Sequence, residues 1–219
     1  MNGELPTLRV GSRPCRCPEP SHEAQLVVVT GGPGAGKTAV LELAAHTFCR
    51  HVAILPEAAT IVFGGGFPRH DSEAGLHASQ QAIFAVQRQL EGLVVDEGRV
   101  GVALCDRGTI DGRAYWPGSP ESFWEAMGST SAGELARYMA VIHLQTPPLD
   151  EGYHQDRIRS ETVGRAREID RLITAAWSDH PRRVFVPPAV EFSSKSAVAL
   201  AAIRATLPSC CRSLEPAST

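Results

Sequence analysis

The sequence has no hydrophobic run long enough to cross a membrane. A spanning helix needs about 20 consecutive apolar residues, whereas the longest apolar runs here cover only a few. Residues 1–20 also lack the hydrophobic core of a signal peptide. We therefore expect a protein without a membrane span, not secreted, and located in the cytoplasm.

Neither sign of charge dominates the chain. Its 219 residues include 21 Lys and Arg against 24 Asp and Glu, so the formal net charge is −3. This balance argues against a broadly basic surface, and we expect no nucleic-acid partner. A hydrophobic content of 43% is ordinary for a soluble globular domain.

Aromatic residues and asparagine are scarce. Phe, Trp and Tyr together make up 6% of the chain, so few rings are available to stack on a planar ligand; the candidates are Phe63, Phe67, Tyr115 and Trp116. Asn2 is the only asparagine. The Asn-Lys-x-Asp sequence by which GTP-dependent switches usually recognise guanine is therefore absent.

Cysteine is present, but its pattern does not predict a metal site. Cys15 and Cys17 lie near one end and Cys210 and Cys211 near the other, while Cys49 and Cys105 fall in an expected helix and strand as buried thiols. A zinc site needs about four ligands, and neither terminal pair has an obvious partner pair. A reducing cytoplasm is the simplest compartment, and the role of the two pairs stays open.

The most informative stretch is Gly31–Thr38, which reads GGPGAGKT. It follows the apolar run Leu26–Val29 and precedes a helical pattern, as the phosphate-binding loop G-x-x-x-x-G-K-[ST] requires. Glycines let backbone N–H groups turn toward a polyphosphate, and the next helix presents the positive end of its dipole. A flexible strand-to-helix turn is the alternative, but the context favours a site for a nucleoside triphosphate.

The residues of this loop have separate expected roles. Lys37 would contact the β- and γ-phosphates, and the Thr38 hydroxyl would ligate Mg²⁺. ATP is the expected nucleotide, with GTP as the alternative. The residues expected to bind it are Gly32, Pro33, Gly34, Ala35, Gly36, Lys37, Thr38 and Ala39.

Strand and helix patterns alternate along the chain. Apolar runs predict strands at 25–30, 52–55, 100–105, 140–145 and 183–186, and helices are expected at 38–50, 72–97, 120–127 and 194–206, with a loop at 63–68. The helix at 72–97 is expected to bury Leu76, Ile83, Val86, Leu90 and Leu93. Such alternation is typical of an α/β fold with a parallel five-stranded sheet and helices on both faces. We expect one three-layer domain over 24–207, a disordered arm at 1–23 and a disordered tail at 208–219.

Polar residues follow the second and third strands, at the edge where α/β sheets bind ligands. Asp106 could hold Mg²⁺ or its water shell, or it could cap a helix. Glu57 could act as general base or anchor an acceptor hydroxyl, or it could favour a helix N-terminus. Arg107 could contact a transferring phosphoryl group or form a structural salt bridge with Glu57. Asp111 could orient Arg107 or the substrate, or it could lie solvated on a helix.

An arginine-rich segment precedes the fifth strand. Residues 156–168 hold four arginines, and their position favours a lid, at about 150–170, that closes over the triphosphate. A solvated helix with i,i+4 ion pairs is the alternative. Arg157 and Arg159 are the leading candidates for catalytic cations, together with Lys37, Glu57, Asp106 and Arg107. Gln87 and Arg88 are weaker candidates for the wall of an acceptor pocket.

Four stretches carry a resemblance to a known family: VVVTGGPGAGKTAVLELAA, LPEAAT, FAVQRQLEGLVVDE and VALCDRGTIDGRAYW. Over about residues 25–190 the chain resembles the P-loop family of NadR-type, AAA_28-like predicted ATPases and kinases. The resemblance implies a kinase-like core with strand order 2-3-1-4-5, and relatives such as ribosylnicotinamide kinases. More distant deoxynucleoside kinases place a glutamate after strand two and an Asp-Arg pair after strand three, as Glu57 and Asp106-Arg107 stand here.

Two hypotheses about function follow. The first is a Mg²⁺-dependent kinase that transfers the γ-phosphoryl group of ATP to a small-molecule hydroxyl, such as that of a nucleoside-like acceptor. The alternative is a nucleotide-switched binding or adaptor protein with slow hydrolysis, since the family includes GTP- and phosphoinositide-binding adaptors. No adenylyltransferase domain precedes the loop, so a bifunctional NAD-salvage enzyme is not expected. The acceptor and the oligomeric state are left open.

Overall fold

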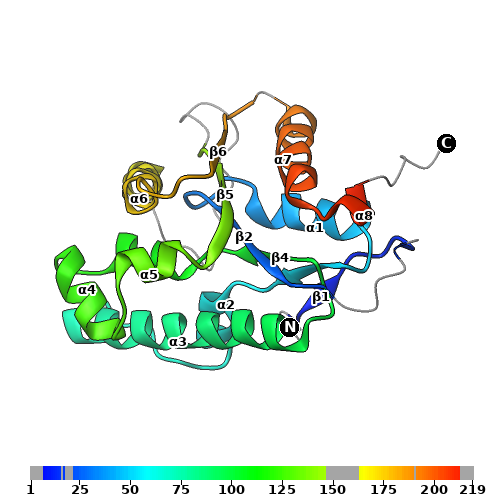
Figure 1. The fold of residues 1–219 in the computed structure, drawn as a ribbon. Coiled ribbons are helices and arrows are strands. Elements are labelled where there is room, and N and C mark those ends of the chain that lie inside the picture. Colours follow the sequence, from blue (N-terminus) through cyan, green and yellow to red (C-terminus); the bar gives the residue numbers. More distant parts are fainter. Residues whose placement is uncertain (1–6, 16, 18–21, 147–162, 190, 213–219) are drawn as a thin grey trace.

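Five apolar segments form a parallel sheet in the computed structural model, which describes residues 7–15, 17, 22–146, 163–189 and 191–212 (Figure 1). The strands are β2 (Gln25–Thr30), β3 (Val52–Leu55), β4 (Val102–Asp106), β5 (Tyr138–Leu144) and β6 (Arg183–Val186). Their spatial order is β3-β4-β2-β5-β6, so the expected order 2-3-1-4-5 is confirmed. The central strands are almost continuously apolar because helices cover both faces of the sheet.

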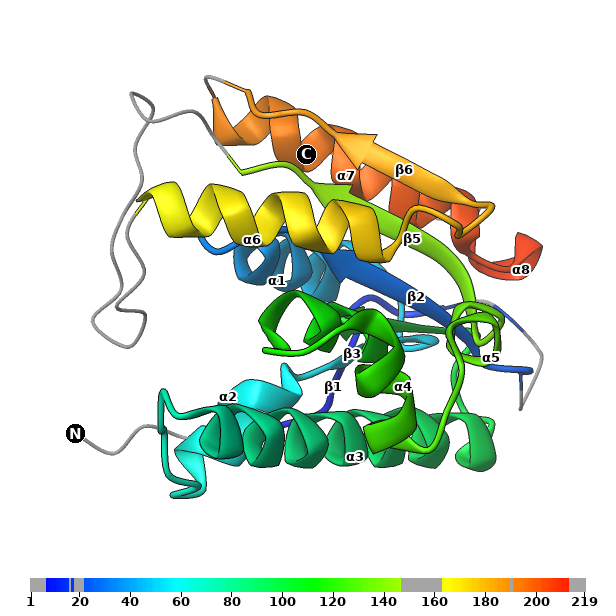
Figure 2. The same cartoon turned by 90° about the vertical axis from the view of Figure 1, so that its left-hand side faces the viewer.

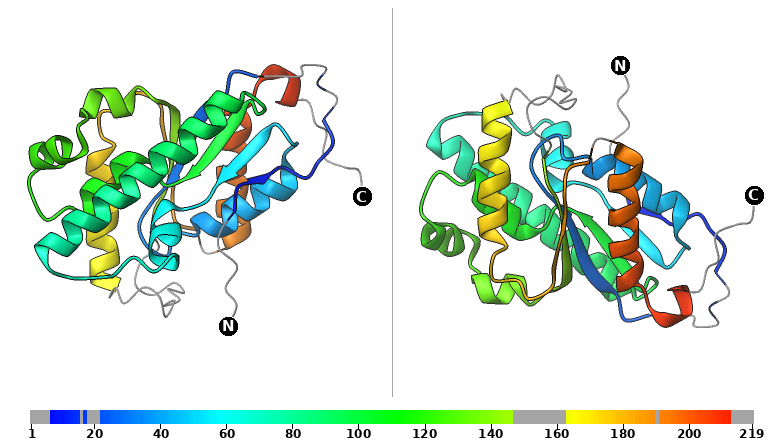
Figure 3. Two further views of the ribbon diagram at one scale, coloured as in Figure 1. Left: turned by 90° about the horizontal axis from the view of Figure 1, so that it is seen from below. Right: turned by 90° about the horizontal axis from the view of Figure 1, so that it is seen from above.

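A sixth strand and a short terminal helix extend this fold beyond the sequence prediction. β1 (Arg9–Val10) pairs antiparallel with β3 at the sheet edge, and α8 (Ser209–Arg212) follows the last long helix. Both lie on the same side of the molecule (Figure 3). The expectation of disorder is therefore wrong for these residues. Their order comes from pairing with the exposed edge of β3 and from packing, which local composition does not reveal.

Helices cover the sheet in two layers (Figure 2). One face packs against α1 (Lys37–Thr47) and α7 (Phe192–Thr206), and the other against α3 (Glu73–Glu97), the 3₁₀ helix η1 (Thr109–Tyr115) and α6 (Val163–Ala176). Successive strand residues alternate between the two cores, as the pleat requires. Helix α1 buries Val40, Leu41 and Ala44 on its inner face, and Phe48, which follows the helix, is buried with them.

Three shorter helices lie between the main elements. They are α2 (Ala58–Gly64), α4 (Pro120–Met127) and α5 (Ser131–Leu135). The loop expected at 63–68 therefore begins later, because Phe63 and Gly64 form the last turn of α2. The predicted bounds of α4 are correct, since Ser119 caps its N-terminus and Gly128 ends it in a left-handed conformation.

The longest described helix, α3, buries a polar face. Its buried residues are Ser79, Gln80, Gln87, Glu91 and Val94, whereas Leu93 is 53% exposed. Of the predicted apolar residues, Leu90 packs against the core and Leu76, Ile83 and Val86 are half-buried, whereas Leu93 faces outward. The most buried positions are polar because partners such as Tyr138 of β5 satisfy them. No helix in the described part of the chain is both long and apolar enough to cross a membrane.

Candidate active site

The glycine-rich loop connects the carboxyl end of β2 to the first turn of α1. Gly34 and Gly36 have φ angles of 75° and 89°, which other residues rarely adopt and glycine adopts readily. Helix α1 begins at Lys37, directly after Gly36. The positive end of the α1 dipole therefore faces the loop, which is the arrangement that favours bound phosphate.

Lys37 reaches back into the same loop. Its Nζ donates hydrogen bonds to the carbonyl oxygens of Gly31 and Gly32, each at 3.0 Å, and its side chain is buried. The ammonium group is thus held in the concave side of the loop before any nucleotide contact. This placement supports the predicted role of Lys37 as a phosphate ligand.

A carboxylate from α6 supports the first turn of the loop. Asp170 Oδ1 accepts a hydrogen bond from the Gly32 N–H at 2.7 Å and lies 2.9 Å from His143 Nε2, while Oδ2 accepts from the Thr146 N–H. Burial acts to raise the pKa of Asp170, but the contacts with His143, Gly32 and Thr146 outweigh it and lower the pKa. Asp170 therefore stays ionised and holds the start of the loop at Gly32.

Lys195 from α7 supports the phosphate loop at Ala35. Its Nζ donates to the Ala35 carbonyl at 2.9 Å and to the Gln145 carbonyl at 2.6 Å. Burial lowers the pKa of Lys195, and Asp170 partly offsets this effect. Neither Asp170 nor Lys195 was predicted from the sequence, because each lies far from the loop in the chain and in no recognisable motif.

The predicted strand-end residues come together beside the loop. Asp106 is the last residue of β4 and pairs in register with Val29 of the neighbouring strand β2. The Arg107 N–H donates to the Val29 carbonyl at 3.1 Å. Glu57 follows β3, which adjoins β4 on the other side. Parallel register therefore places all three residues at the edge that holds the phosphate loop.

Arg107 links Glu57 to the loop. Its Nε lies 2.8 Å from Glu57 Oε1, and its guanidinium also donates to the Gly31 carbonyl at 3.3 Å. Arg107 has a φ of 70°, which lies in the left-handed region that non-glycine residues seldom occupy. Residues held in this conformation are often found at functional sites. Burial opposes its charge, but Tyr115, Glu57 and Asp111 raise the pKa of Arg107 well above its ordinary value.

Asp111 organises the segment that follows Arg107. Its Oδ2 accepts hydrogen bonds from the Gly108 N–H at 2.9 Å and from Trp177 Nε1 at 3.2 Å. Its Oδ1 accepts from the Thr30 hydroxyl and lies 3.4 Å from Arg107 Nη1. Asp111 is buried, so the alternative of a solvated carboxylate is wrong, and its contact with Arg107 supports the orienting role.

The two predicted metal ligands are oxygen donors at this same edge. Thr38 lies in the first turn of α1 and is exposed, and Asp106 ends β4 and is partly buried. A hydroxyl and a carboxylate are hard ligands of the kind Mg²⁺ prefers. The donor set therefore fits a magnesium ion bound together with nucleotide phosphates.

Other predicted site residues have different outcomes. Arg157 and Arg159 lie outside the described residues, and only the end of the expected lid, from residue 163, is seen as part of α6. Gln87 donates to Glu91 at 2.7 Å and Arg88 pairs with Glu134 at 2.9 Å. Both belong to a polar cluster between α3, α5 and β5, so the structure gives them a packing role.

Two of the aromatic candidates already contact neighbouring side chains. Trp116 stacks on His77 with ring centroids 4.2 Å apart, and the Arg69 guanidinium lies 4.0 Å from the centre of Phe63. Phe192, which was not predicted from the sequence, lies beside the phosphate loop. A Cβ at Gly36 would lie 3.3 Å from its ring, and Phe192 is 44% exposed.

Comparisons with known proteins agree with this geometry. Residues 26–195 match the family AAA_28, described as an AAA domain. The crystal structure of a NadR protein in complex with NAD and AMP-PNP has the same fold, with a TM-score of 0.56 and 14% identity over 90% of this chain. The chain corresponds to 52% of that protein, about half its length. A search among curated proteins finds no match.

Proposed function

The chain belongs to the AAA_28 family of P-loop domains, and from this premise we propose that it is a Mg²⁺-dependent kinase that transfers the γ-phosphoryl group of ATP to a small-molecule hydroxyl. The similar NadR structure was solved with AMP-PNP, which supports ATP as the nucleotide. A nucleoside-like acceptor and a location in the cytoplasm are part of the same proposal.

The observation that carries the proposal is the ion pair between Glu57 and Arg107 beside the phosphate loop. Arg107 contacts both the Glu57 carboxylate and the Gly31 carbonyl. In this proposal the Glu57 carboxylate, held through Arg107 beside the loop, would lie next to the terminal phosphate. A site used only to hold a nucleotide has no need of such a group, whereas a kinase uses it to position the attacking hydroxyl.

The pairing with Arg107 favours one of the two roles considered for Glu57. The guanidinium holds the carboxylate in a fixed orientation, with Arg107 Nε 2.8 Å from Oε1, while Oε2 accepts a hydrogen bond from the Thr60 hydroxyl. Phosphoryl transfer through a loose transition state requires positioning and charge stabilisation more than proton removal. Glu57 would therefore accept a hydrogen bond from the acceptor hydroxyl and align it with the γ-phosphorus.

The remaining residues would neutralise charge on the triphosphate. Lys37 is already held within the loop, and Thr38 and Asp106 are the residues that would hold Mg²⁺, which supplies positive charge to the phosphate oxygens. Asp170 and Lys195 would keep the loop in its binding shape from opposite sides. Arg157 and Arg159 stay candidates for cations supplied by the lid.

The proposal is tested by acceptor-stimulated release of ADP. We expect a panel of nucleosides and small alcohols to include at least one that raises the rate above basal hydrolysis, with a phosphorylated product detected by mass spectrometry. Lys37→Ala serves as the blank for contaminating kinases. If every acceptor leaves the rate at the basal level, the kinase proposal fails and the nucleotide-switched binding protein takes its place.

Glu57→Gln separates positioning from nucleotide binding. The amide keeps the size of the side chain but loses its negative charge, so we expect acceptor-dependent kcat to fall by about 100-fold. Nucleotide Kd, measured by calorimetry, should change by less than about threefold, because Glu57 is not expected to contact ATP. Equal losses in transfer and binding would show that Glu57 is structural.

A further inference from the structure

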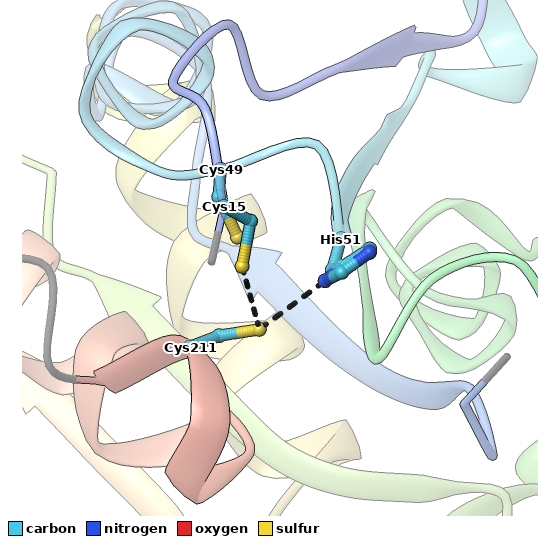
Figure 4. Close-up of side chains that lie close together, drawn as sticks. All are labelled: Cys15, Cys49, His51 and Cys211. Carbon is cyan, nitrogen blue, oxygen red and sulfur yellow. Dashed lines mark hydrogen bonds between the residues drawn. The ribbon is translucent and has the colours of Figure 1, made fainter. Parts of the chain in front are cut away.

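Four potential metal ligands from three separate parts of the chain converge at the opposite end of the sheet from the phosphate loop. Cys15 comes from the segment after β1, Cys49 and His51 from the connection between α1 and β3, and Cys211 from α8 (Figure 4). Their ligand atoms all lie within 4.8 Å of one another. The side chains point toward a common centre (Figure 4).

The spacing of these atoms matches a tetrahedral zinc site. With Zn–S bonds of about 2.3 Å and Zn–N bonds of about 2.0–2.1 Å, tetrahedral geometry places two sulfurs about 3.8 Å apart and a sulfur and a nitrogen about 3.6 Å apart. Cys15 Sγ lies 3.8 Å from Cys211 Sγ, and Cys211 Sγ lies 3.4 Å from His51 Nδ1. Both distances fit this arrangement.

The surroundings suit bound thiolates and a neutral imidazole. Cys49 and Cys211 are fully buried and His51 is 5% exposed, so a metal held here would be shielded from water. The Cys17 N–H donates to Cys15 Sγ at 3.4 Å. Hydrogen bonds of this kind stabilise a thiolate ligand.

We propose that Cys15, Cys49, His51 and Cys211 bind a structural Zn²⁺ ion that joins the two ends of the chain to the α1–β3 connection. Four protein ligands leave no open coordination position, which is typical of a structural zinc site and not of a catalytic one. The ion links residues up to 196 positions apart. It would thereby hold β1 and α8 against the sheet edge, independently of the reaction at the phosphate loop.

This site was not predicted from the sequence because its ligands do not occur as two close pairs. Each terminal cysteine pair contributes one member, and the other two ligands are Cys49 and His51, two positions apart in the chain. A second, overlapping set consists of Cys17, His22, His51 and Cys211. The hydrogen bond to Cys15 and the complete burial of Cys49 favour the first set.

The proposal predicts one zinc per chain in the full-length reduced protein. Metal content after gel filtration, measured by mass spectrometry, should be close to one equivalent, and removal with a strong chelator should lower Tm by about 5 °C or more. Adding Zn²⁺ should restore Tm. Replacement by Co²⁺ should give the intense visible absorption of a tetrahedral thiolate site.

Single variants identify the ligands. Cys15→Ser and Cys211→Ser should each lower the zinc content of the purified protein at least about tenfold. Mutating a residue that only supports a metal ligand already costs about 10–100-fold in metal affinity. Cys210→Ser is the matched control, because Cys210 adjoins Cys211 in α8 with the two sulfurs 3.7 Å apart and belongs to neither set. It should keep one equivalent.

Three results would overturn the proposal. The first is reduced wild-type protein that neither contains nor takes up zinc. The second is loss of zinc in Cys17→Ser and His22→Ala while Cys15→Ser retains it, which would assign the metal to the other set. The third is freshly purified, metal-free protein with a Cys15–Cys211 disulfide, detected by the loss of two hydrogens in its intact mass.

Discussion

Lys37 illustrates how a single residue is prepared for its ligand before that ligand arrives. Two carbonyl oxygens of its own loop hold the ammonium group, so little side-chain entropy is lost on binding phosphate. Lys37→Ala should reduce phosphoryl transfer by about 100-fold or more, since it removes a charge contact made at the reacting phosphates. Steady-state kinetics would measure the loss. An unchanged Tm would show that the fold is intact, and full activity in the variant would contradict the assigned role.

Asp170 gives the site a pH dependence at the residue scale. Its pKa is lowered in the folded protein from an ordinary value of 3.8, so its contribution to stability is present above that pH and is lost as the pH falls through the lower folded pKa. Asp170→Asn should therefore reduce the free energy of unfolding by about 1–2 kcal/mol at neutral pH. Urea titrations should show the difference from wild type shrinking only below about pH 4. A difference that disappears near neutral pH would contradict this account.

At the scale of elements, Gly108 fixes how closely η1 approaches the sheet and α6. A Cβ at this position would lie 2.8 Å from the Trp177 ring and 2.9 Å from Val28. Trp177 and the Val28 side chain are fully buried and have no room to move. Gly108→Ala should therefore lower the free energy of unfolding by about 1–3 kcal/mol through overpacking.

Gly92 in α3 is the matched control for this substitution. A Cβ there would meet no atom within 4 Å, so Gly92→Ala should stabilise the protein by up to about 1 kcal/mol through its helix propensity. Chemical denaturation of the two variants separates the effects. Equal effects of the two substitutions would show that close packing at Gly108 is not the cause.

At the scale of the whole molecule, a buried polar cluster connects α3 to the sheet. Glu91 lies 2.6 Å from Arg137 and accepts hydrogen bonds from Tyr138 and Gln87. Burial raises the pKa of Glu91, although Arg137 opposes this effect. Glu91→Ala leaves these partners buried and incompletely bonded, so the free energy of unfolding should fall by about 3–5 kcal/mol.

The exposed pair of Arg171 and Glu168 on α6 provides the comparison. Arg171→Ala should leave the urea midpoint unchanged, because solvent screens an ion pair at the surface. A shift in that midpoint as large as that of Glu91→Ala would show that charge removal itself, and not burial, is responsible.

Short-range patterns in the amino-acid sequence were enough to predict several parts of this protein. Glycine spacing predicts the phosphate loop, because few residues tolerate its backbone angles. Apolar runs predict the five central strands, because strands covered on both faces must be apolar. Parallel topology then predicts that Glu57, Asp106 and Arg107 lie at one edge, and the structure brings them together there.

Contacts between segments that are distant in the chain became visible only in the folded structure. Asp170 meets Gly32 across 138 residues, and Lys195 meets Ala35 across 160. The polar face of α3 is buried because partners from other elements satisfy it. Cys15 and Cys211 meet because the segment after β1 and helix α8 lie at the same end of the sheet. In each case the residue type alone is compatible with many environments. The role of the residue depends on a partner that only folding brings close to it.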